Sequence, residues 1–144
     1  MKLLILNGPN LNMLGVRKPE IYGRKTLAEI MDELAAFLGG RGVQCEFLQS
    51  NHEGELIDRI HAAFGNTDGI LINPGALTHY SYALRDALEA VGIPTVEVHL
   101  SDIHSRESFR SASVIEPVCI AQVSALGERS YFVGAELLLS KIGG

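Results

Sequence analysis

Two neighbouring side chains in this sequence have the types and the spacing that proton transfer needs. Glu97 and His99 are two residues apart in a stretch, 95–99, that is predicted to be a strand, so both side chains point to the same face. A carboxylate beside an imidazole fixes the tautomer of the ring and stabilises its cationic form, which suits a general acid. The same spacing also fits a polar pair that only satisfies nearby helix ends.

A second pair, Arg17 and Tyr22, lies in a long segment between the first predicted strand and the first predicted helix. Loops of that length inside compact domains are usually functional or disordered. A free phenol has a pKa of about 10, and a nearby guanidinium favours the phenolate. We therefore interpret the segment as an active-site lid on which Arg17 makes Tyr22 a usable base. A loop-anchoring Tyr22 beside a solvated Arg17 is equally compatible with the residues alone.

Polar residues follow three of the predicted strands at the point where each strand ends. These are Asn7-Gly8-Pro9-Asn10 after the first strand, Asn73-Pro74-Gly75 after the third, and the run 97–101 at the end of the fourth. In open parallel sheets, ligands bind outside the carboxyl ends of the strands, where the strand order reverses. The sequence therefore predicts a functional site at this edge.

Two arginines and a histidine come shortly after these strand ends. Arg106 and Arg110 are four residues apart in a predicted short helix, 104–112, so they would share one face and could hold an anionic or hydroxylated ligand. A solvated helix face is the alternative. His79 lies near the start of a predicted helix, 78–92, where backbone N–H groups favour anions.

Asp86 is on the same side of that predicted helix as His79, at a spacing of seven residues, and Tyr82 lies between them. Because Asp86 is two turns further along, a ligand that it serves would belong to another subunit. A plain surface carboxylate fits the spacing equally well.

Strand-like and helix-like segments alternate along the whole chain. Strands are expected at 3–7, 43–47, 69–73, 95–99 and 118–123, and helices at 27–38, 53–64, 78–92, 104–112 and 131–142, with capping boxes at Thr26–Glu29 and Ser50–Glu53. This alternation predicts one α/β domain over residues 1–144, a flavodoxin-like, doubly wound parallel sheet of five strands in the order 2-1-3-4-5 with helices on both faces.

Composition excludes several classes of protein. The net charge is −5 and no long basic run is present, which argues against nucleic-acid binding. No signal peptide or membrane-spanning run is visible. Cys45 and Cys119 have the context of reduced core residues, which suits a cytoplasmic protein, and no spacing resembles a zinc or haem site.

Three motifs together carry a resemblance to a known family. They are NGPNLNMLGVRKPEIYG, NPGALTHYSYALRDAL and VEVHLSDIHSRESFR, in this order along nearly the whole chain. In this combination they resemble type II 3-dehydroquinate dehydratase of the shikimate pathway. The resemblance implies a flavodoxin-like enzyme that converts 3-dehydroquinate to 3-dehydroshikimate and water by anti elimination, without metal, cofactor or Schiff base.

The resemblance also implies catalytic roles. Tyr22, as a phenolate kept charged by Arg17, would take the proton beside the substrate ketone. The resulting enolate would be stabilised through a water held near Asn10 and Pro9. His99, oriented by Glu97, would protonate the leaving hydroxyl at C1.

Substrate contacts follow from the same resemblance. Asn73 and the backbone at Leu100 and Ser101 would hold the substrate carboxylate, and His79 and Arg110 would contact ring hydroxyls. Arg106 would be a second cationic group, near the base or at the junction of the loop with the core. Asp86 would reach into the site of a neighbouring subunit, in a dodecamer that is built from trimers.

Two other classes of function are alternatives for this sequence. A flavodoxin-like signalling domain would carry clustered acidic residues at the end of the first strand, and a nucleotide-binding domain would carry G-x-G-x-x-G or a P-loop, and neither pattern is present. A relative that keeps the fold and acts on another cyclic hydroxy acid is the second alternative. Formation of a conjugated enone from 3-dehydroquinate separates all three.

Overall fold

The computed structural model describes residues 1–16, 18–105 and 107–143, with all their side chains except those of Ile21, Tyr22 and Arg110. Within these ranges the chain forms a sheet of five parallel strands in the order β2-β1-β3-β4-β5. The strands are β1 (Lys2–Asn7), β2 (Gln44–Gln49), β3 (Gly69–Asn73), β4 (Thr95–Val98) and β5 (Ala121–Val123). The predicted fold class and strand order are confirmed.

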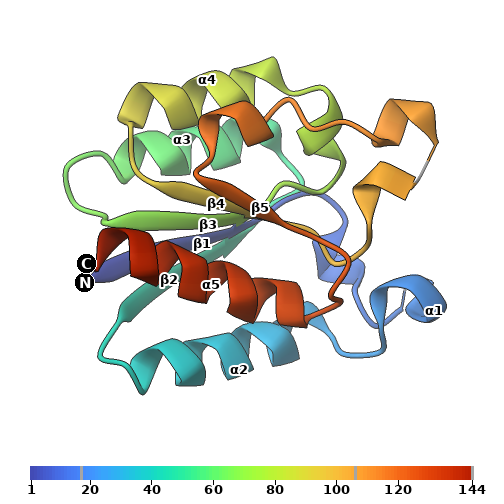
Figure 1. Ribbon diagram of the computed structural model, residues 1–144, viewed down its shortest axis with the longest axis horizontal. Coiled ribbons are helices and arrows are strands. Elements are labelled where there is room, and N and C mark those ends of the chain that lie inside the picture. Colours follow the sequence, from blue (N-terminus) through green and yellow to red (C-terminus); the bar gives the residue numbers. More distant parts are fainter. Residues whose placement is uncertain (17, 106, 144) are drawn as a thin grey trace.

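Helices cover both faces of this sheet (Figure 1). Helices α2 (Leu27–Gly39) and α5 (Arg129–Ile142) lie on one face, and α3 (Glu53–Ala62) and α4 (Tyr82–Val91) lie on the other. The short helix α1 (Pro19–Tyr22) projects beyond the carboxyl ends of the strands, on the same side as the turns that follow β4. The segment predicted to be a lid therefore begins at the expected edge of the sheet.

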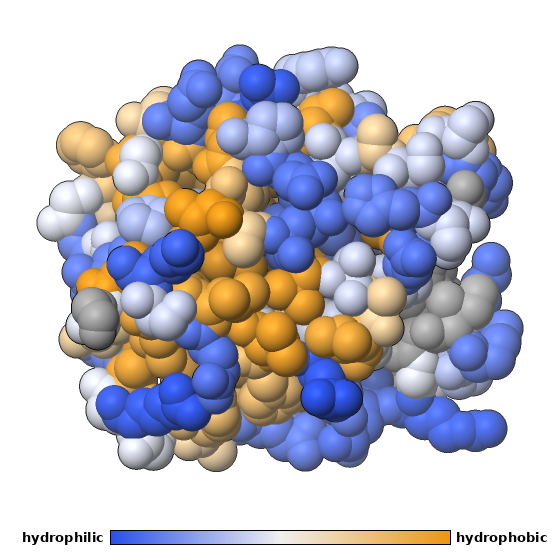
Figure 2. Space-filling view, viewed as in Figure 1, coloured by the Kyte–Doolittle hydropathy of each residue, from blue (hydrophilic) through white to orange (hydrophobic). Residues whose placement is uncertain are grey.

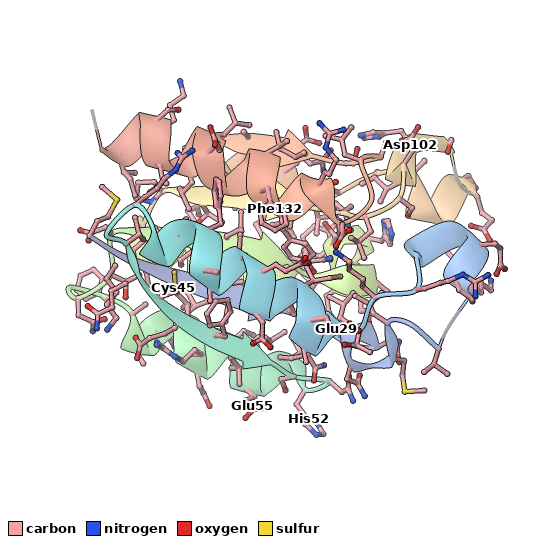
Figure 3. The ribbon with its side chains drawn as sticks, turned by 90° about the horizontal axis from the view of Figure 1, so that it is seen from below. Glu29, Cys45, His52, Glu55, Asp102 and Phe132 are labelled. Atoms are coloured by element: carbon pink, nitrogen blue, oxygen red, sulfur yellow. The ribbon has the colours of Figure 1, made fainter. Side chains whose placement is uncertain are left out.

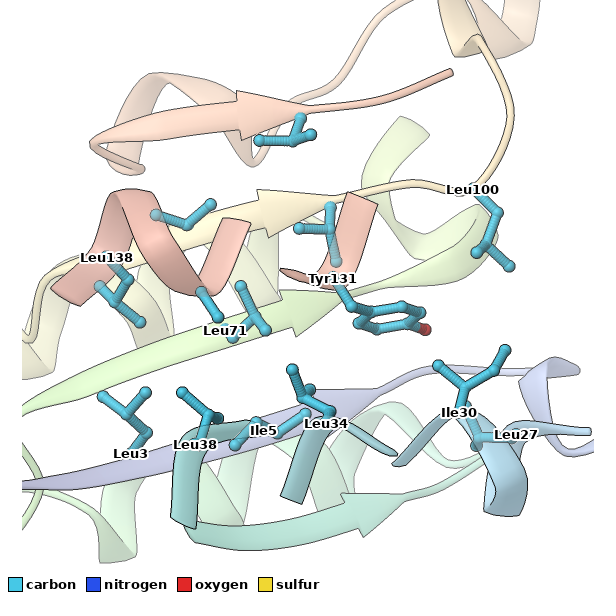
Figure 4. Packing of buried hydrophobic residues seen from close by; sticks show 14 of the residues in the cluster. Leu3, Ile5, Leu27, Ile30, Leu34, Leu38, Leu71, Leu100, Tyr131 and Leu138 are labelled. Atoms are coloured by element: carbon cyan, nitrogen blue, oxygen red, sulfur yellow. The ribbon is translucent and has the colours of Figure 1, made fainter. Parts of the chain in front are cut away.

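The central strands are apolar on both sides because both of their faces are covered. In β1, Leu3 and Ile5 join the hydrophobic cluster under α2 and α5, whereas Leu4 and Leu6 join the cluster under α3 and α4. All four side chains are fully buried. A nearly continuous apolar run is therefore the pattern that a central parallel strand requires. Figure 4 shows the first of these clusters, between the sheet and helices α2 and α5.

The predicted capping box at Thr26 is confirmed. The Thr26 hydroxyl accepts a hydrogen bond from the backbone N–H of Glu29 at 3.2 Å, and the Glu29 carboxylate accepts one from the backbone N–H of Thr26 at 3.0 Å. Figure 3 labels Glu29 in the first turn of α2. These bonds satisfy two N–H groups that the helix leaves without an internal partner, and so fix where the long N-terminal segment ends.

The prediction of a second capping box at Ser50–Glu53 is wrong. The N-cap of α3 is His52, whose side chain makes no capping bond. Ser50 accepts a hydrogen bond from the His52 N–H at 2.9 Å and donates one to Glu55. Figure 3 labels His52 and Glu55 at this end of α3. The Glu53 carboxylate instead accepts a hydrogen bond from Ser81 at the start of α4. A contact between two helices has replaced the local bond.

The predicted helix 78–92 begins later than expected. Residues Gly75–His79 form a 3₁₀ helix, and α4 starts only at Tyr82, because Ser81 caps it by accepting from the Leu84 N–H at 3.0 Å. His79 is therefore not on the helix that carries Asp86. The prediction that these two side chains line one helical face is wrong.

The predicted helix 104–112 is also wrong. Two 3₁₀ helices, Ile103–Ser105 and Ser108–Arg110, occupy this stretch, and Glu107 between them is not helical. The continuous helix from which a shared face for Arg106 and Arg110 was inferred is therefore not formed. The last strand is shorter than predicted, because the 3₁₀ helix Glu116–Val118, with Pro117 near its start, precedes β5.

Candidate active site

Glu97 and His99 lie together in the protein interior at the end of β4. Glu97 is 0% exposed and His99 is 5% exposed, and His99 Nε2 is hydrogen-bonded to Glu97 Oε2. The backbone N–H of His99 donates to the carbonyl of Val123 at 2.9 Å, which fixes the residue against β5. Because an ionised carboxylate only accepts, Nε2 carries the proton of this bond, and Nδ1 is the nitrogen that can face a ligand.

Two hydroxyl groups complete the surroundings of the Glu97 carboxylate. Thr78 donates to Oε2, and Ser113 lies 3.0 Å from Oε1 and 2.9 Å from Oε2. Ser113 in turn accepts from the backbone N–H groups of Ile115 and Glu116 at 3.1 and 3.0 Å. Three elements of the chain therefore converge on one buried carboxylate.

These contacts decide the charge of Glu97. Burial acts to raise the pKa of its carboxyl group, but the hydrogen bonds from His99, Thr78 and Ser113 outweigh burial and hold the pKa below its ordinary value. Glu97 is thus an anion at neutral pH. A buried anion bonded to Nε2 fixes the orientation of the His99 ring.

A lowered pKa makes the stability of the protein depend on pH. The contribution of Glu97 is fully present above the pKa of an unfolded glutamate, about 4.3, and is lost as the pH falls through the lower pKa of the folded state. We expect Glu97→Gln to have a lower urea midpoint of unfolding than wild type at pH 7. The difference between the two midpoints should narrow toward pH 3. Glu89→Gln, on an exposed part of α4, is the control. A difference between the midpoints that stays constant with pH would contradict a lowered pKa of Glu97 in the folded protein.

The carboxyl ends of β1 and β3 are locked together beside this pair. Asn7 and Asn73, the last residues of the two strands, are direct partners in the register. The backbone N–H of Gly8 donates to the Asn73 carbonyl at 2.8 Å, and a Cβ atom at Gly8 would lie 2.4 Å from the carbonyl oxygen of Pro74. Only glycine permits this approach, which places the segment from Pro9 onward next to the loop after β3.

Asn73 is buried, and its side-chain amide is bonded on both sides. Its oxygen accepts from the backbone N–H of Gly75 at 3.2 Å, and its nitrogen donates to the hydroxyl of Tyr131 at 3.0 Å. The Tyr131 hydroxyl donates to Asn7 Oδ1 at 2.6 Å. This network joins α5 to the ends of two strands at the predicted site.

The remaining described candidates surround the same edge of the sheet. His79 Nδ1 donates to the carbonyl of Ala112 at 2.7 Å, which leaves Nε2 as the nitrogen that can meet a ligand. Leu100 and Ser101 follow His99, and their carbonyl groups accept from Gly127 and Ala125 at 2.9 and 3.3 Å. The turn after β4 is thereby held against the segment that leads into α5.

Asn10 and Asp86 are exposed. Asn10 has a positive φ of 70°, and its backbone N–H donates to Asn51 Oδ1 at 2.9 Å. Asp86 lies on α4. Arg17 and Arg106 lie outside the described residues, as do the side chains of Tyr22 and Arg110, so the predictions for these four remain predictions.

The part of the chain that the structure describes has neither a metal-binding cluster nor a helix of membrane-spanning length. No group of three or more histidine, cysteine, aspartate or glutamate side chains there could hold a metal ion. No helix in the same part of the chain is long and apolar enough to cross a membrane.

Known proteins match this chain along almost its whole length. A family model described as "Dehydroquinase class II" matches residues 1–139. The chain belongs to the class II dehydroquinase family. It is 56% identical over 139 residues to the 3-dehydroquinate dehydratase of Carboxydothermus hydrogenoformans, covering 96% of this chain and 90% of that protein. The corresponding enzyme of Bacillus subtilis is 52% identical over 141 residues, covering 98% and 95%.

A solved structure agrees with this membership. The type II dehydroquinase from Butyrivibrio crossotus superposes with a TM-score of 0.94 at 47% identity, covering 96% of this chain and 97% of that one. The family suggested by the three sequence motifs is thus confirmed, and the flavodoxin-like architecture is that of a class II dehydroquinase.

The site in this class II dehydroquinase contains three residues that the sequence analysis did not select. Thr78 and Ser113 hold Glu97, and Tyr131 holds Asn73. Nothing in their local spacing marks the two hydroxyl residues. A tyrosine in a stripe predicted to be buried did carry a signal, because a buried hydroxyl usually needs a hydrogen-bond partner.

Proposed function

We propose that this chain is a hydro-lyase that dehydrates 3-dehydroquinate to 3-dehydroshikimate in the shikimate pathway. Membership of the class II dehydroquinase family supports this, as does the name of its relatives in Carboxydothermus hydrogenoformans and Bacillus subtilis. The structural observation that carries the proposal is the buried Glu97–His99 pair at the end of β4. An ionised carboxylate behind an imidazole, at the edge of the sheet where ligands bind, suits a general acid.

The proposed reaction begins with removal of a proton from carbon. The phenolate oxygen of Tyr22 takes the proton beside the substrate ketone, and the electrons of the broken C–H bond form an enolate. Arg17 favours the phenolate electrostatically. A water molecule near Asn10 would donate to the enolate oxygen. Loss of one such donor typically costs about 3 kcal/mol of transition-state stabilisation.

The second step expels the hydroxyl group at C1. The enolate collapses to the ketone, the new C=C double bond forms and the C1–O bond breaks, while His99 gives its proton to the leaving oxygen to produce water. Tyr22 ends as a phenol and His99 as a neutral imidazole, so the proton returns from one to the other through solvent before the next cycle. Each positioned acid or base contributes roughly 10²–10⁴-fold to the rate.

The substrate-binding part of the proposal uses the groups around the two strand ends. Asn73 and the backbone of Leu100 and Ser101 would hold the carboxylate of the substrate. His79 and Arg110 would contact its ring hydroxyls. The bond from His79 Nδ1 to Ala112 supports this role, because it turns Nε2 away from the protein backbone.

Assembly of the chain is part of the same proposal. Following the family resemblance, we propose a dodecamer of four trimers in which Asp86, exposed on α4, reaches the site of a neighbouring subunit. A groove lined by Phe37, Phe132 and Leu137 lies between α2 and α5, where hydrophobic side chains gather in Figure 2. Light scattering at micromolar concentration tests the proposed mass.

A cytoplasmic location is also proposed, supported by the free cysteines Cys45 and Cys119.

The activity is tested by adding 3-dehydroquinate to the wild-type protein and following the ultraviolet absorbance of the conjugated enone. We expect the enone to accumulate at a rate proportional to protein concentration. A flavodoxin-like binding module, or a relative that acts on another cyclic hydroxy acid, would give no enone. That result would remove the proposed activity.

A further inference from the structure

A buried tyrosine that the proposed reaction does not use lies directly beneath the proposed carboxylate site. Tyr131 is in the first turn of α5 and is 0% exposed. Figure 4 shows its ring within the cluster under α5, with the hydroxyl pointing toward the carboxyl ends of the strands. The hydroxyl is bonded to Asn73 at 3.0 Å and to Asn7 at 2.6 Å, which end two adjacent strands.

The direction of every hydrogen bond in this network follows from one group at its end. The backbone N–H of Gly75 can only donate, so it must meet the oxygen of the Asn73 amide, at 3.2 Å. The nitrogen of that amide must then face Tyr131 and donate to its oxygen. The Tyr131 hydroxyl, having accepted there, gives its own proton to Asn7 Oδ1, and the Asn7 nitrogen donates to Met31 Sδ at 3.4 Å.

These hydrogen-bond directions leave the Asn73 amide with one N–H group that can bind a ligand. Its nitrogen has two hydrogens, and the planar amide fixes the second once the first is held by Tyr131. The second N–H is the group that can meet a carboxylate. If the amide were turned over, its NH₂ group would face the N–H of Gly75 and its oxygen would occupy the ligand side, where it would repel an anion.

We propose that Tyr131 is a positioning residue, whose hydroxyl immobilises the Asn73 amide in the orientation set by the Gly75 N–H, so that an amide N–H group is presented to the substrate carboxylate. The inference rests on the proposed function, in which Asn73 binds that carboxylate. Burial raises the pKa of Tyr131, so the phenol keeps its proton and remains a donor to Asn7 at neutral pH. A phenylalanine would fill the same space without fixing the amide.

The test compares Tyr131→Phe, Asn73→Ala and the double variant by kcat/KM for 3-dehydroquinate. We expect Tyr131→Phe to lower kcat/KM about tenfold, the size of one net hydrogen bond, with most of the loss in KM. The double variant should be no worse than Asn73→Ala alone, because the hydroxyl acts through that amide. Losses that multiply, or an unchanged KM in Tyr131→Phe, would overturn the proposal.

Leu138→Ala is the matched control for loss of packing. Leu138 is buried in the same helix and the same cluster and is not a member of the hydrogen-bond network. This variant should lower the melting temperature and leave KM unchanged. If Tyr131→Phe does not fold, Asn7→Leu replaces it, since it removes the acceptor of the Tyr131 proton, and the same lack of further loss with Asn73→Ala is expected.

Magnetic resonance of the wild-type protein separates this inference from the proposed function. In the inferred orientation, the Asn73 side-chain amide protons show a nuclear Overhauser effect to the Tyr131 hydroxyl proton. In the reversed orientation they show one to the Gly75 amide proton, which would overturn the inference whatever the activity. A wild-type protein that forms no enone would instead remove the proposed function, and the resonance result would still decide the orientation.

Discussion

Replacing Tyr22 with phenylalanine should lower kcat by roughly 10²–10⁴-fold while substrate binding stays nearly intact. The phenol oxygen is the proposed base, and phenylalanine keeps the ring and removes only that oxygen. The change is measured as the rate of enone formation at saturating 3-dehydroquinate, and binding is measured by calorimetry in the slow variant. Near-normal turnover would exclude Tyr22 as the base.

The matched control is Tyr80→Phe, which removes the same hydroxyl from a side chain that is 61% exposed. We expect this variant to keep the kcat and the KM of wild type. Helix α1 ends at Tyr22 and lies beyond the carboxyl ends of the strands, as a base carried on a lid requires.

Replacing His99 with alanine should also lower kcat by about 10²–10⁴-fold, but it should leave the first chemical step in place. The enolate can still form in this variant, whereas the C1 hydroxyl lacks a proton donor and departs slowly. In D₂O, the proton beside the ketone should therefore exchange with solvent in His99→Ala and not in Tyr22→Phe. Proton magnetic resonance of the substrate measures both.

The variant Glu97→Gln tests the role of the carboxylate in the Glu97–His99 pair. The amide of glutamine carries no charge to stabilise a cationic ring, so turnover should fall while exchange at carbon continues. If His99→Ala lost exchange and Tyr22→Phe kept it, the assignment of acid and base would be reversed. Glu89→Gln, on the exposed part of α4, should leave both rates unchanged.

The parts of the fold that depend on local sequence could be predicted. Apolar runs and helical stripes located the strands and the main helices, and the pair at 97 and 99 was found because side chains two apart on a strand share a face. Register then explains why the strand ends meet, since Asn7 pairs with Asn73 and Ile72 with Glu97.

The predictions failed where a distant residue replaced a local partner. Thr26 and Ser50 have the same capping-box pattern. The Glu53 carboxylate, however, accepts a hydrogen bond from Ser81, which is 28 residues away in the chain, and does not make the capping bond expected at the start of its own helix. Thr78 and Ser113 bond to Glu97 across 19 and 16 residues, and Tyr131 reaches Asn7 across 124. Tertiary packing brings these distant residues together, and no residue spacing in the sequence predicts such contacts.

The helix predicted at 104–112 failed for a different reason. Its expected start, His104, bonds instead to the Ser111 carbonyl at 2.9 Å and to the Gln122 side chain at 3.2 Å, which ties a pair of 3₁₀ helices to β5. The hydrogen bonds to Gln122 and Ser111 raise the pKa of His104. Helical spacing was therefore a poor guide to the structure of this segment.

The central claim is that the phenolate of Tyr22, favoured by the guanidinium of Arg17, takes the proton from carbon. The pH dependence of kcat/KM in wild type and in Arg17→Ala tests this claim most directly. The activity limb that reports ionisation of the base should move to higher pH in the variant, because the phenolate has lost the charge that favours it. Arg41→Ala is the control, because the Arg41 guanidinium lies in the turn after α2 and pairs with Glu136 of α5 at 2.6 Å; this variant should keep the wild-type profile. An Arg17→Ala enzyme with full activity and an unmoved limb would contradict the role of the guanidinium.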